Sequence, residues 1–352
     1  MTNDAMSMKT RAARHRHILA VFAGIAALLV PAVYWWRHVS WTRAGRVTFS
    51  GAEYIHYIDG DDVILLTSFD ALRVLDRGRR EYVWKRPDLG GMHRIVGVPG
   101  ADSVLLQNDA ASFVRIDTRT GKILARFRFD RRGSYYCIPS PDGTSVLAGD
   151  GIIALDGTGE KLVCSVPDQY HQASPCAGAF SSDGTVAAME ARRGNQRVSL
   201  VLEPGGATDV RELDFEDAVA GPLLAIHKSA GVILAASDSA IEGYALDSGE
   251  RLWSIAAPAF GVADWAIVPE QPIALAGTRG GSLLGIDCKT GRVVFARVMD
   301  GSKAIWQVEV SPSGKEVAIS VLPRYDDPFA VFPRGEYVKL YQLADLRNDV
   351  PK

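Results

Sequence analysis

A short turn motif recurs along the chain at a nearly constant interval, and this repeat restricts the fold more than any other feature. In each copy an Asp closes an apolar stretch, a Gly-containing turn follows, and a second apolar stretch begins. The steps between successive Asp residues are 39, 91 and 40 positions, and 91 is about two such steps with one degenerate copy between them. A period near 40 built from short strands is typical of a β-propeller. The four Asp residues are Asp117, Asp156, Asp247 and Asp287.

A second turn, Ser-Pro-Asp-Gly or a variant of it, separates two apolar stretches in three places. Its Asp-Gly or Ser-Gly pair supplies the positive φ angles that a tight hairpin needs, so each copy predicts a reversal between two strands. Counting strands between the two kinds of turn gives seven copies of a four-stranded unit. The Ser-Pro-Asp-Gly-type turns lie at residues 140–143, 181–184 and 311–314.

Two of the seven copies are irregular. In the fourth, a loop around Gly194 and a Gly-Gly turn replace the Asp motif, and the seventh ends at Asp345 before a fourth strand. Residues 46–49 resemble an outer strand and have no inner strands before them. We expect them to pair with residues 337–343, because this pairing closes the ring and removes an open sheet edge. The predicted fold class is therefore an all-β, seven-bladed β-propeller closed by an N-terminal strand and preceded by a single N-terminal transmembrane helix.

The predicted transmembrane helix is an apolar segment near the start of the chain. Residues 18–36 are 19 consecutive uncharged residues, which is about 28 Å of helix and close to the hydrocarbon thickness of a bilayer. Four Lys or Arg residues precede the segment, and a Tyr-Trp-Trp cluster ends it at the position where interfacial aromatics are expected. The predicted segments are a basic cytoplasmic leader (1–17), the transmembrane anchor (18–36), a linker (37–45), the propeller (46–345) and a C-terminal tail (346–352).

A cleaved signal peptide is the alternative for this segment, since Val30, Pro31 and Ala32 have the spacing found before a cut. The apolar run continues past Ala32, which favours the uncleaved anchor. Basic residues are slightly more numerous before the span than after it, so the positive-inside rule places the N-terminus in the cytoplasm. The richness in Ala, Gly, Arg and Asp indicates a bacterium with a GC-rich genome. We therefore predict a single-pass protein of the bacterial inner membrane whose propeller faces the periplasm.

The charge distribution limits the partners of the propeller. The chain has 39 Lys or Arg and 41 Asp or Glu residues, but residues 1–46 hold seven basic and one acidic residue. The remainder is acidic, with 32 basic and 40 acidic residues. An acidic domain lacks the electrostatic attraction on which nucleic-acid binding depends, so we predict no nucleic-acid partner. The basic leader suits anionic lipid headgroups.

A search for reactive groups yields no catalytic set. The four cysteines form no CxxC and no zinc spacing. Cys137 and Cys176 fall near innermost strands of adjacent blades, so an inter-blade disulfide and buried thiols remain alternative predictions. His56, His93 and His227 lie on or beside innermost strands at different depths, which favours structural roles over a metal site. Because no nucleophile elbow or phosphate-binding glycine loop is present, we predict no catalytic, metal or cofactor-binding residues and no cofactor.

Aromatic residues near the starts of innermost strands are the candidates for binding a partner, because Tyr and Trp combine large contact area with a polar group. Burial between blades is their alternative role. A longer loop at residues 323–335, rich in aromatic and charged residues, interrupts the last copy and is either a specialised loop or a cap over a blade edge. Trp84 and Trp253 occupy equivalent outer-strand positions, which predicts packing between blades. The candidate partner-binding residues are Tyr135, Trp265, Trp306, Arg324, Tyr325, Phe329 and Phe332.

These motifs resemble a known superfamily. The Asp-x-x-Thr-Gly-Lys unit at residues 117–122, its copy at 287–292 and the Trp of Arg-Leu-Trp253-Ser are similar to the repeats of pyrroloquinoline-quinone-dehydrogenase-like and YVTN-like propellers. The Ser-Pro-Asp-Gly turns are similar to those of WD-repeat-like bacterial propellers. The resemblance covers about residues 46–345 and implies the propeller fold. Quinone-dependent members have eight blades, adjacent cysteines and a calcium site, none of which this sequence shows, so their cofactor is not implied.

Two classes of function follow from the sequence. The first is a non-catalytic, membrane-anchored propeller that acts as a protein-interaction scaffold or accessory subunit of an envelope complex. It is favoured by the repeat architecture, the predicted anchor and the lack of a recognisable catalytic set. The alternative is a periplasmic enzyme or enzyme subunit with a ligand site in the propeller channel. A lactonase-like hydrolase and the large subunit of an amine dehydrogenase are the two examples of this class.

The sequence makes one prediction that does not require a structure. If residues 18–36 are an uncleaved anchor, N-terminal sequencing of the mature protein will find residues that precede the apolar segment. A mature protein that starts at Val33 would show that the segment is a signal peptide and would remove the anchor.

Overall fold

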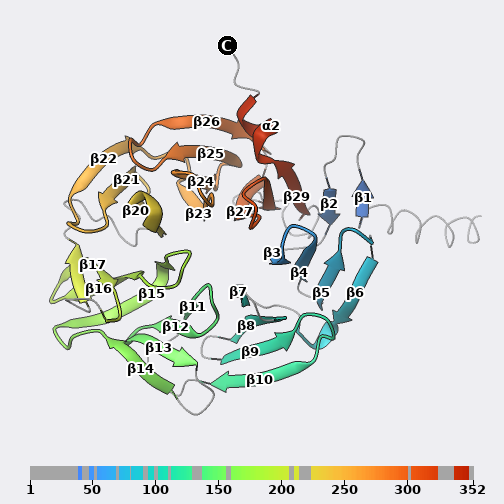
Figure 1. Cartoon of the computed structure of the whole chain (residues 1–352). Helices are drawn as coiled ribbons and strands as arrows, with labels where there is room; N and C mark the ends of the chain where they lie inside the picture. Colours follow the sequence, from blue (N-terminus) through green and yellow to red (C-terminus); the bar gives the residue numbers. More distant parts are fainter. Residues whose placement is uncertain are drawn as a thin grey trace, which may run out of the picture.

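The computed structural model describes strands that form seven antiparallel sheets arranged in a ring (Figure 1). Six of these sheets have four strands and one has five. The predicted all-β, seven-bladed propeller is therefore confirmed. The structure describes residues 39–41, 47–50, 54–68, 71–79, 81–89, 94–98, 102–109, 112–128, 137–155, 160–205, 210–213, 223–299, 303–323 and 337–348.

Blades 1 to 4 follow one another along the chain. Blade 1 contains β3 (Tyr54–Asp59), β4 (Val63–Ser68), β5 (Ala71–Asp76) and β6 (Glu81–Arg86), followed by the short helix η1 (Pro87–Leu89). Blade 2 contains β7 (Arg94–Val98), β8 (Ser103–Asp109), β9 (Ser112–Asp117) and β10 (Ile123–Arg128). Blade 3 contains β11 (Ile138–Pro139), β12 (Ser145–Ala148), β13 (Gly151–Leu155) and β14 (Glu160–Ser165). Blade 4 contains β15 (Tyr170–Phe180), β16 (Ala187–Arg193), β17 (Gln196–Leu202) and β18 (Val210–Leu213).

Blades 5 to 7 complete the ring. Blade 5 contains β19 (Leu223–His227), the short helix η2 (Lys228–Ala230), β20 (Val232–Ala236), β21 (Ala240–Ala245) and β22 (Arg251–Ala256). Blade 6 contains β23 (Val262–Ile267), β24 (Ile273–Thr278), β25 (Ser282–Asp287) and β26 (Val293–Val298). Blade 7 contains β27 (Lys303–Val310), β28 (Glu316–Pro323) and β29 (Tyr337–Gln342), and the helix α2 (Leu343–Asn348) follows it.

Strand direction gives the ring two distinct faces. In every blade the chain enters the innermost strand from the same face, which we name the crossover face because the chain also passes between blades there. The first-to-second and third-to-fourth turns lie on the opposite face, which we name the turn face. The Ser-Pro-Asp-Gly-type turns and the Asp-Gly turns that the structure describes, at Asp117, Asp247 and Asp287, therefore lie on the turn face.

The ring is closed by strands from the two ends of the chain. Strand β2 (Val47–Ser50) pairs antiparallel with β29, and Thr48 and Phe49 lie opposite Lys339 and Val338. This confirms the predicted N-terminal closing strand. Strand β1 (Val39–Trp41) pairs with the outer edge of β2 and gives blade 7 five strands. Its three residues are too few for a periodic signal, and the sequence prediction placed a linker there.

Apolar clusters join each blade to its neighbour. One cluster combines Ile55 and Ile64 of blade 1 with Val338 and Leu340 of blade 7, and another combines Leu65 of blade 1 with residues of blade 2. Successive residues of a strand point to opposite faces of its sheet, and here both faces are covered by neighbouring blades. This explains why inner strands such as Val63–Ser68 are nearly continuous apolar runs.

The Asp-Gly turns have the geometry that the motif predicts. The Asp117 carboxylate accepts hydrogen bonds from the backbone N–H of Arg119 and Thr120, at 3.1 and 2.7 Å, and from the Thr120 hydroxyl at 2.8 Å. Gly121 has a φ of 68°, in the left-handed region that glycine adopts readily. The same contacts recur at the Asp287 turn of blade 6. The hydrogen bonds from Thr120 hold the pKa of Asp117 below its usual value.

Tryptophan side chains of outer strands pack on the Asp-Gly turns of the next blade. The Trp84 indole donates a hydrogen bond to the Thr118 carbonyl at 2.7 Å, and Trp253 donates one to the Cys288 carbonyl at 2.8 Å. A Cβ atom on Gly121 would lie 2.9 Å from the Trp84 ring, and one on Gly291 would lie 2.6 Å from the Trp253 ring. The two glycines are thus required both by the turn and by the ring that covers it. The predicted inter-blade role of both tryptophans is confirmed.

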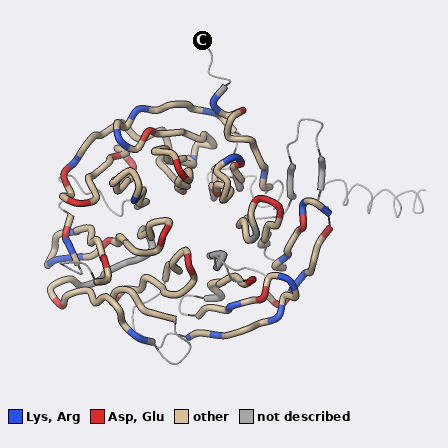
Figure 2. Tube along the Cα trace, viewed as in Figure 1, with Lys and Arg blue, Asp and Glu red and all other residues tan. Residues whose placement is uncertain are grey.

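Charged residues protect the outer edges of the blades. Figure 2 shows Lys and Arg residues distributed along the perimeter of the ring, where each outermost strand has an unpaired edge. Strand β6 has the sequence EYVWKR and β10 has ILARFR. Charged side chains on an edge strand oppose pairing with another chain.

Three predictions fall wholly or partly outside the described residues. No helix in the described part of the chain is long and apolar enough to span a membrane, and the predicted span at 18–36 lies outside that part. The turn at Asp156 also lies outside it. Cys137 is buried, but nothing is described of the Cys176 side chain, so the disulfide between them stays a prediction.

The packing of Trp253 generates a stability prediction. We expect Trp253→Ala to lower the free energy of unfolding by about 3 kcal/mol, because it removes the contact between blades 5 and 6. Trp253→Phe should recover more than half of this loss, since it keeps a ring over Gly291 and loses the hydrogen bond to Cys288. Urea denaturation followed by circular dichroism measures both. The control is Leu252→Ala, a neighbouring side chain that is 47% exposed; a loss as large as that of Trp253→Ala would contradict the inter-blade role.

The turn carboxylates also generate a pH prediction. Partial burial opposes ionisation of Asp183, but hydrogen bonds from Lys228, Ser181 and Thr185 outweigh it and hold the pKa of Asp183 well below its ordinary value of 3.8. The stabilisation from a lowered pKa is present above 3.8 and is lost as the pH falls below that value. Asp183→Asn should therefore reduce the free energy of unfolding at pH 7 and flatten its decline between pH 5 and pH 3. Denaturant titrations at several pH values measure this, and parallel curves for the two proteins would contradict it.

Candidate interaction site

The innermost strands of blades 6, 7 and 1 are joined by side-chain hydrogen bonds. The Asp264 carboxylate accepts a hydrogen bond from the Val308 N–H at 2.8 Å. The Gln307 side chain accepts one from the Ile55 N–H and donates one to the Ile55 carbonyl, both at 2.9 Å. These contacts hold the inner strands of three blades in fixed positions.

Trp306 immediately precedes these fixed positions on β27 and is exposed. The register of β27 against β28 shifts between Ile305 and Gln307, so Trp306 is the extra residue of a β-bulge. Bulges redirect a side chain and are frequent beside functional sites. Its side chain is 37% exposed, which is compatible with the predicted partner-binding role. That role stays a prediction.

Trp265 is packed between blades. It contacts apolar residues of blades 5 and 6, including Leu234 and Ile241, and its indole donates a hydrogen bond to the Leu223 carbonyl at 3.2 Å. This is the burial that the sequence left open as its alternative role. Trp265 is half-buried, and its binding of a partner stays a prediction.

The remaining candidates lie outside the described residues, so their predicted role is untested. Strand β28 ends at Pro323 and β29 begins at Tyr337, so both ends of the segment that joins them lie at the crossover face. The innermost strand β27 also begins at that face. The candidates in question are Tyr135, Arg324, Tyr325, Phe329 and Phe332.

Two of the three histidines make contacts between blades. The Nδ1 atom of His56 lies 2.8 Å from a Glu309 carboxylate oxygen. The Nε2 atom of His227 lies 2.5 Å from the Gln271 carbonyl, and its Nδ1 accepts from the Ala230 N–H at 3.4 Å. His93 lies outside the described residues, and within them no three His, Cys, Asp or Glu side chains are arranged to hold a metal ion.

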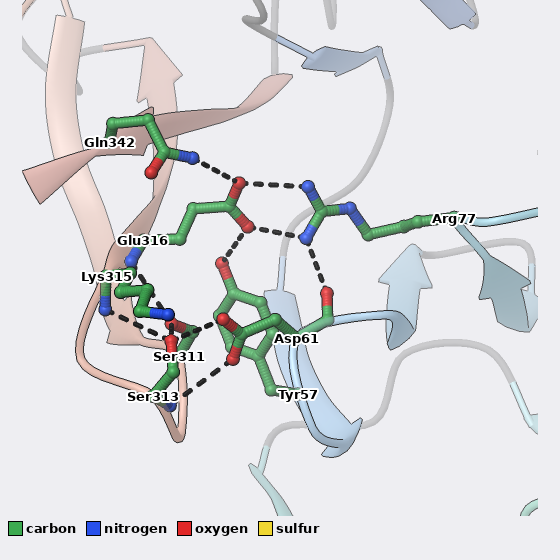
Figure 3. A network of polar contacts seen from close by, with 8 residues as sticks. All are labelled: Tyr57, Asp61, Arg77, Ser311, Ser313, Lys315, Glu316 and Gln342. Carbon is green, nitrogen blue, oxygen red and sulfur yellow. Dashed lines mark hydrogen bonds and ion pairs between the residues drawn. The ribbon is translucent and has the colours of Figure 1, made fainter.

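A network of polar side chains seals blade 7 against blade 1 on the turn face (Figure 3). Its centre is Glu316, which is 4% exposed. The Arg77 guanidinium donates to both oxygens of the Glu316 carboxylate, at 2.6 and 2.9 Å. Tyr57 and Gln342 donate further hydrogen bonds to it, at 3.1 and 3.2 Å. The buried carboxylate is thus paired with Arg77 by a bidentate contact, and both of its oxygens accept further hydrogen bonds.

The environment of Tyr57 keeps its phenol protonated. Burial raises the pKa of Tyr57, and the negative charge of Glu316 and the hydrogen bond to it raise it further. The protonated phenol is therefore available to donate its hydrogen bond to the Glu316 carboxylate.

A second contact ties the same two blades together. Ser313 occupies the position that Asp holds in the Ser-Pro-Asp-Gly turns, and its hydroxyl donates to the Asp61 carboxylate of blade 1. The Ser313 N–H lies 3.3 Å from the other oxygen of Asp61. At the turn of blade 4, by contrast, Asp183 is paired with Lys228 of blade 5 at 2.6 Å. In the seventh copy the turn residue is Ser313, and the carboxylate of the inter-blade contact comes from Asp61 of blade 1 instead.

The Arg77–Glu316 pair and its partners were not predicted from the sequence. Arg77 follows the Asp of an ordinary turn, and Glu316 is one acidic residue at the start of a strand. The one signal in the sequence was the charge of Glu316 before the mostly apolar residues 317–321, because a charged residue that begins a buried strand needs a partner. The identity of that partner depends on ring closure, which brings residues 239 positions apart into contact.

The architecture and these turns define a PQQ-like β-propeller. A family profile described as outer membrane protein assembly factor BamB matches residues 36–297, about three quarters of the chain. The chain therefore belongs to this family.

A search of curated proteins found no match. Among solved structures, dihydro-heme d1 dehydrogenase NirN in complex with DHE is similar with a TM-score of 0.56 and 16% sequence identity. The alignment covers 83% of this chain and 73% of that chain. At this identity the likeness concerns the fold alone.

The closure network generates a mutational prediction. We expect Arg77→Met and Glu316→Leu each to lower the free energy of unfolding by about 3–5 kcal/mol, because each leaves a buried charge without its partner. The double variant should be more stable than either single variant, since no unpaired charge remains. Chemical denaturation of the four proteins measures the coupling. Strictly additive losses would show that the pair does not act as a unit.

Proposed function

We propose that this protein is a membrane-anchored, non-catalytic propeller that acts as a protein-interaction scaffold or accessory subunit of an envelope complex. The observation that carries this proposal is its membership of a family described by an outer-membrane assembly factor. The fold supports it, because a closed ring with clamped inner strands presents a rigid surface to a partner. A rigid surface loses little conformational entropy when it binds.

The proposed binding residue on the described surface is Trp306. It is held in position by the Asp264 and Gln307 contacts of the adjoining strands, and much of its side chain faces solvent. Trp is among the residues that contribute most to protein interfaces, where its loss typically costs 2 kcal/mol or more. The proposed surface is completed by the other residues that the sequence suggests as partner-binding: Tyr135, Trp265, Arg324, Tyr325, Phe329 and Phe332.

The proposed location is the bacterial inner membrane, with one span at residues 18–36 and the propeller in the periplasm. The support is the apolar length of that segment, the basic residues before it and the aromatic residues at its end. A family of envelope propellers is compatible with this location.

The alternative, a periplasmic enzyme or enzyme subunit, has less support. The similar solved structure is that of a dehydrogenase, but a likeness at 16% identity carries no activity to this chain. Within the described residues, no three His, Cys, Asp or Glu side chains are arranged to hold a metal ion. A lactonase-like hydrolase or an amine-dehydrogenase subunit would need ligand-binding residues of its own.

Purification of the full chain in a mild detergent tests the proposal. We expect a co-purifying protein in stoichiometric amount, and Trp306→Ala should reduce its recovery at least tenfold, as the loss of an interface Trp predicts. Leu252→Ala is the matched control, because Leu252 is an exposed apolar residue on an outer strand. A chain that purifies alone with bound metal or quinone would contradict the scaffold function and support the enzyme.

A further inference from the structure

Strand β1 begins at the crossover face of blade 7, which fixes where the preceding chain reaches the ring. Strand β2 ends at Ser50, and only three residues later Tyr54 starts β3 at the crossover face. Val39 lies opposite Phe49 in the antiparallel pair of β1 and β2. The first residue of β1 is therefore at the crossover end of the outermost strand of blade 7.

The distance along the chain to the proposed membrane span is short. The span ends at Trp36, and two residues separate it from Val39. The three peptide steps from Trp36 to Val39 reach about 10 Å at full extension. If the span crosses the bilayer, the crossover end of β1 lies within about that distance of the membrane surface.

Exposed apolar residues are distributed unequally between the two faces. Nine large apolar side chains are exposed within the described ranges, and seven of them belong to outer strands. Of the other two, Phe260 lies at the crossover end of blade 6, and Trp306 lies within the innermost strand β27 of blade 7. No described turn on the turn face exposes a large apolar side chain. The turn face is instead made of Asp, Ser, Thr, Lys and Arg residues at its turns.

The two most exposed of these side chains both lie at the crossover end of blade 6, one at its innermost strand and one at its outermost strand. Val298 is 74% exposed and ends β26, and Phe260 is 60% exposed and immediately precedes Gly261 and β23. Backbone at Gly280 and Gly281 lies between them. A Cβ atom on Gly280 would be 3.3 Å from the Phe260 ring, and the Met299 N–H donates to the Gly281 carbonyl at 2.9 Å.

The backbone of Phe260 is strained, and its side chain faces solvent. Its φ is 71°, a conformation that a bulky side chain rarely adopts. Strained residues persist where the surrounding structure holds them, and they are concentrated at binding sites. The exposed Arg279 stands beside Gly280 and supplies a positive charge at the same edge.

We propose that the crossover edge of blades 6 and 7 rests on the lipid headgroup surface, with Phe260 and Val298 in the interface. The inference depends on the proposed anchor. A short tether at blade 7 brings this edge to the membrane, aromatic and apolar side chains are stable at the interface, and Arg279 faces lipid phosphates. The opposite face, with its charged turns, then faces the periplasm. A partner bound at Trp306 is consequently held near the membrane as well.

Fluorescent labels on single introduced cysteines test this orientation. The full chain is labelled at Phe260→Cys, Val298→Cys or Lys289→Cys with an environment-sensitive nitrobenzoxadiazole group and reconstituted into vesicles of phosphatidylethanolamine and phosphatidylglycerol. Lys289 is the matched control, because it is exposed in the turn face of the same blade. The unsubstituted chain, labelled in parallel, gives the background from the native cysteines.

We expect labels at positions 260 and 298 to shift to shorter emission wavelength and to be quenched at least twofold by lipids spin-labelled near the headgroup. The label at 289 should show neither change. Equal quenching at 289 and 260, or no quenching at 260 and 298, would overturn the orientation. Val298→Cys keeps the test valid if Phe260→Cys does not fold.

Carbonate extraction of the same vesicles separates this inference from the proposed anchor. A chain that stays in the membrane but shows no quenching at positions 260 and 298 contradicts only the orientation. A chain that carbonate releases contradicts the membrane anchor of the proposed function itself.

Discussion

The rest of this structure depends on the contact between blade 7 and blade 1. Every other blade meets a neighbour that follows it directly in sequence, whereas these two are joined by chain segments almost 300 residues apart. Backbone pairing of β2 with β29 supplies the outer part of the seal, and the Arg77–Glu316 pair with Tyr57 supplies the part on the turn face. Without the seal, blades 1 and 7 would each expose an apolar face that is now covered.

Closure also explains which parts of the ring are suited to binding. On the turn face, polar groups of the turns already make hydrogen bonds within and between blades, as at Asp183 and Ser313. Two exposed aromatic residues lie elsewhere: Trp306 within the innermost strand of blade 7, and Phe260 at the crossover face, where it is held in a strained conformation. A rigid ring whose turns are hydrogen-bonded and which exposes aromatic residues away from those turns suits a protein that holds others in position. In the proposed anchored chain, the few residues between the span and β1 would keep the crossover face near the membrane.

Sequence reasoning predicted the local features of this fold well, because they repeat. Each Asp-Gly turn and each alternation of strands is specified within about 40 residues, and the closing strand was identified because it had no inner strands of its own. The Trp84 and Trp253 contacts followed from their equivalent positions. Features that occur once were missed: the Glu316 network and the exposed Phe260 depend on residues that meet only after closure or on a backbone angle that Phe rarely adopts. Trp265 looked like Trp306 in the sequence, but packing between blades covers much more of it.

Closure of the ring by an N-terminal strand can be tested by native-state hydrogen exchange in the full chain and in Thr48→Pro. Proline at position 48 removes a backbone N–H and disturbs the pairing of β2 with β29. We predict that the amides of β29 and of β3 and β4 in blade 1 are protected in the native chain and lose protection together in the variant. Unchanged protection of β29 in Thr48→Pro, or loss confined to residues 47–50, would contradict closure by this strand.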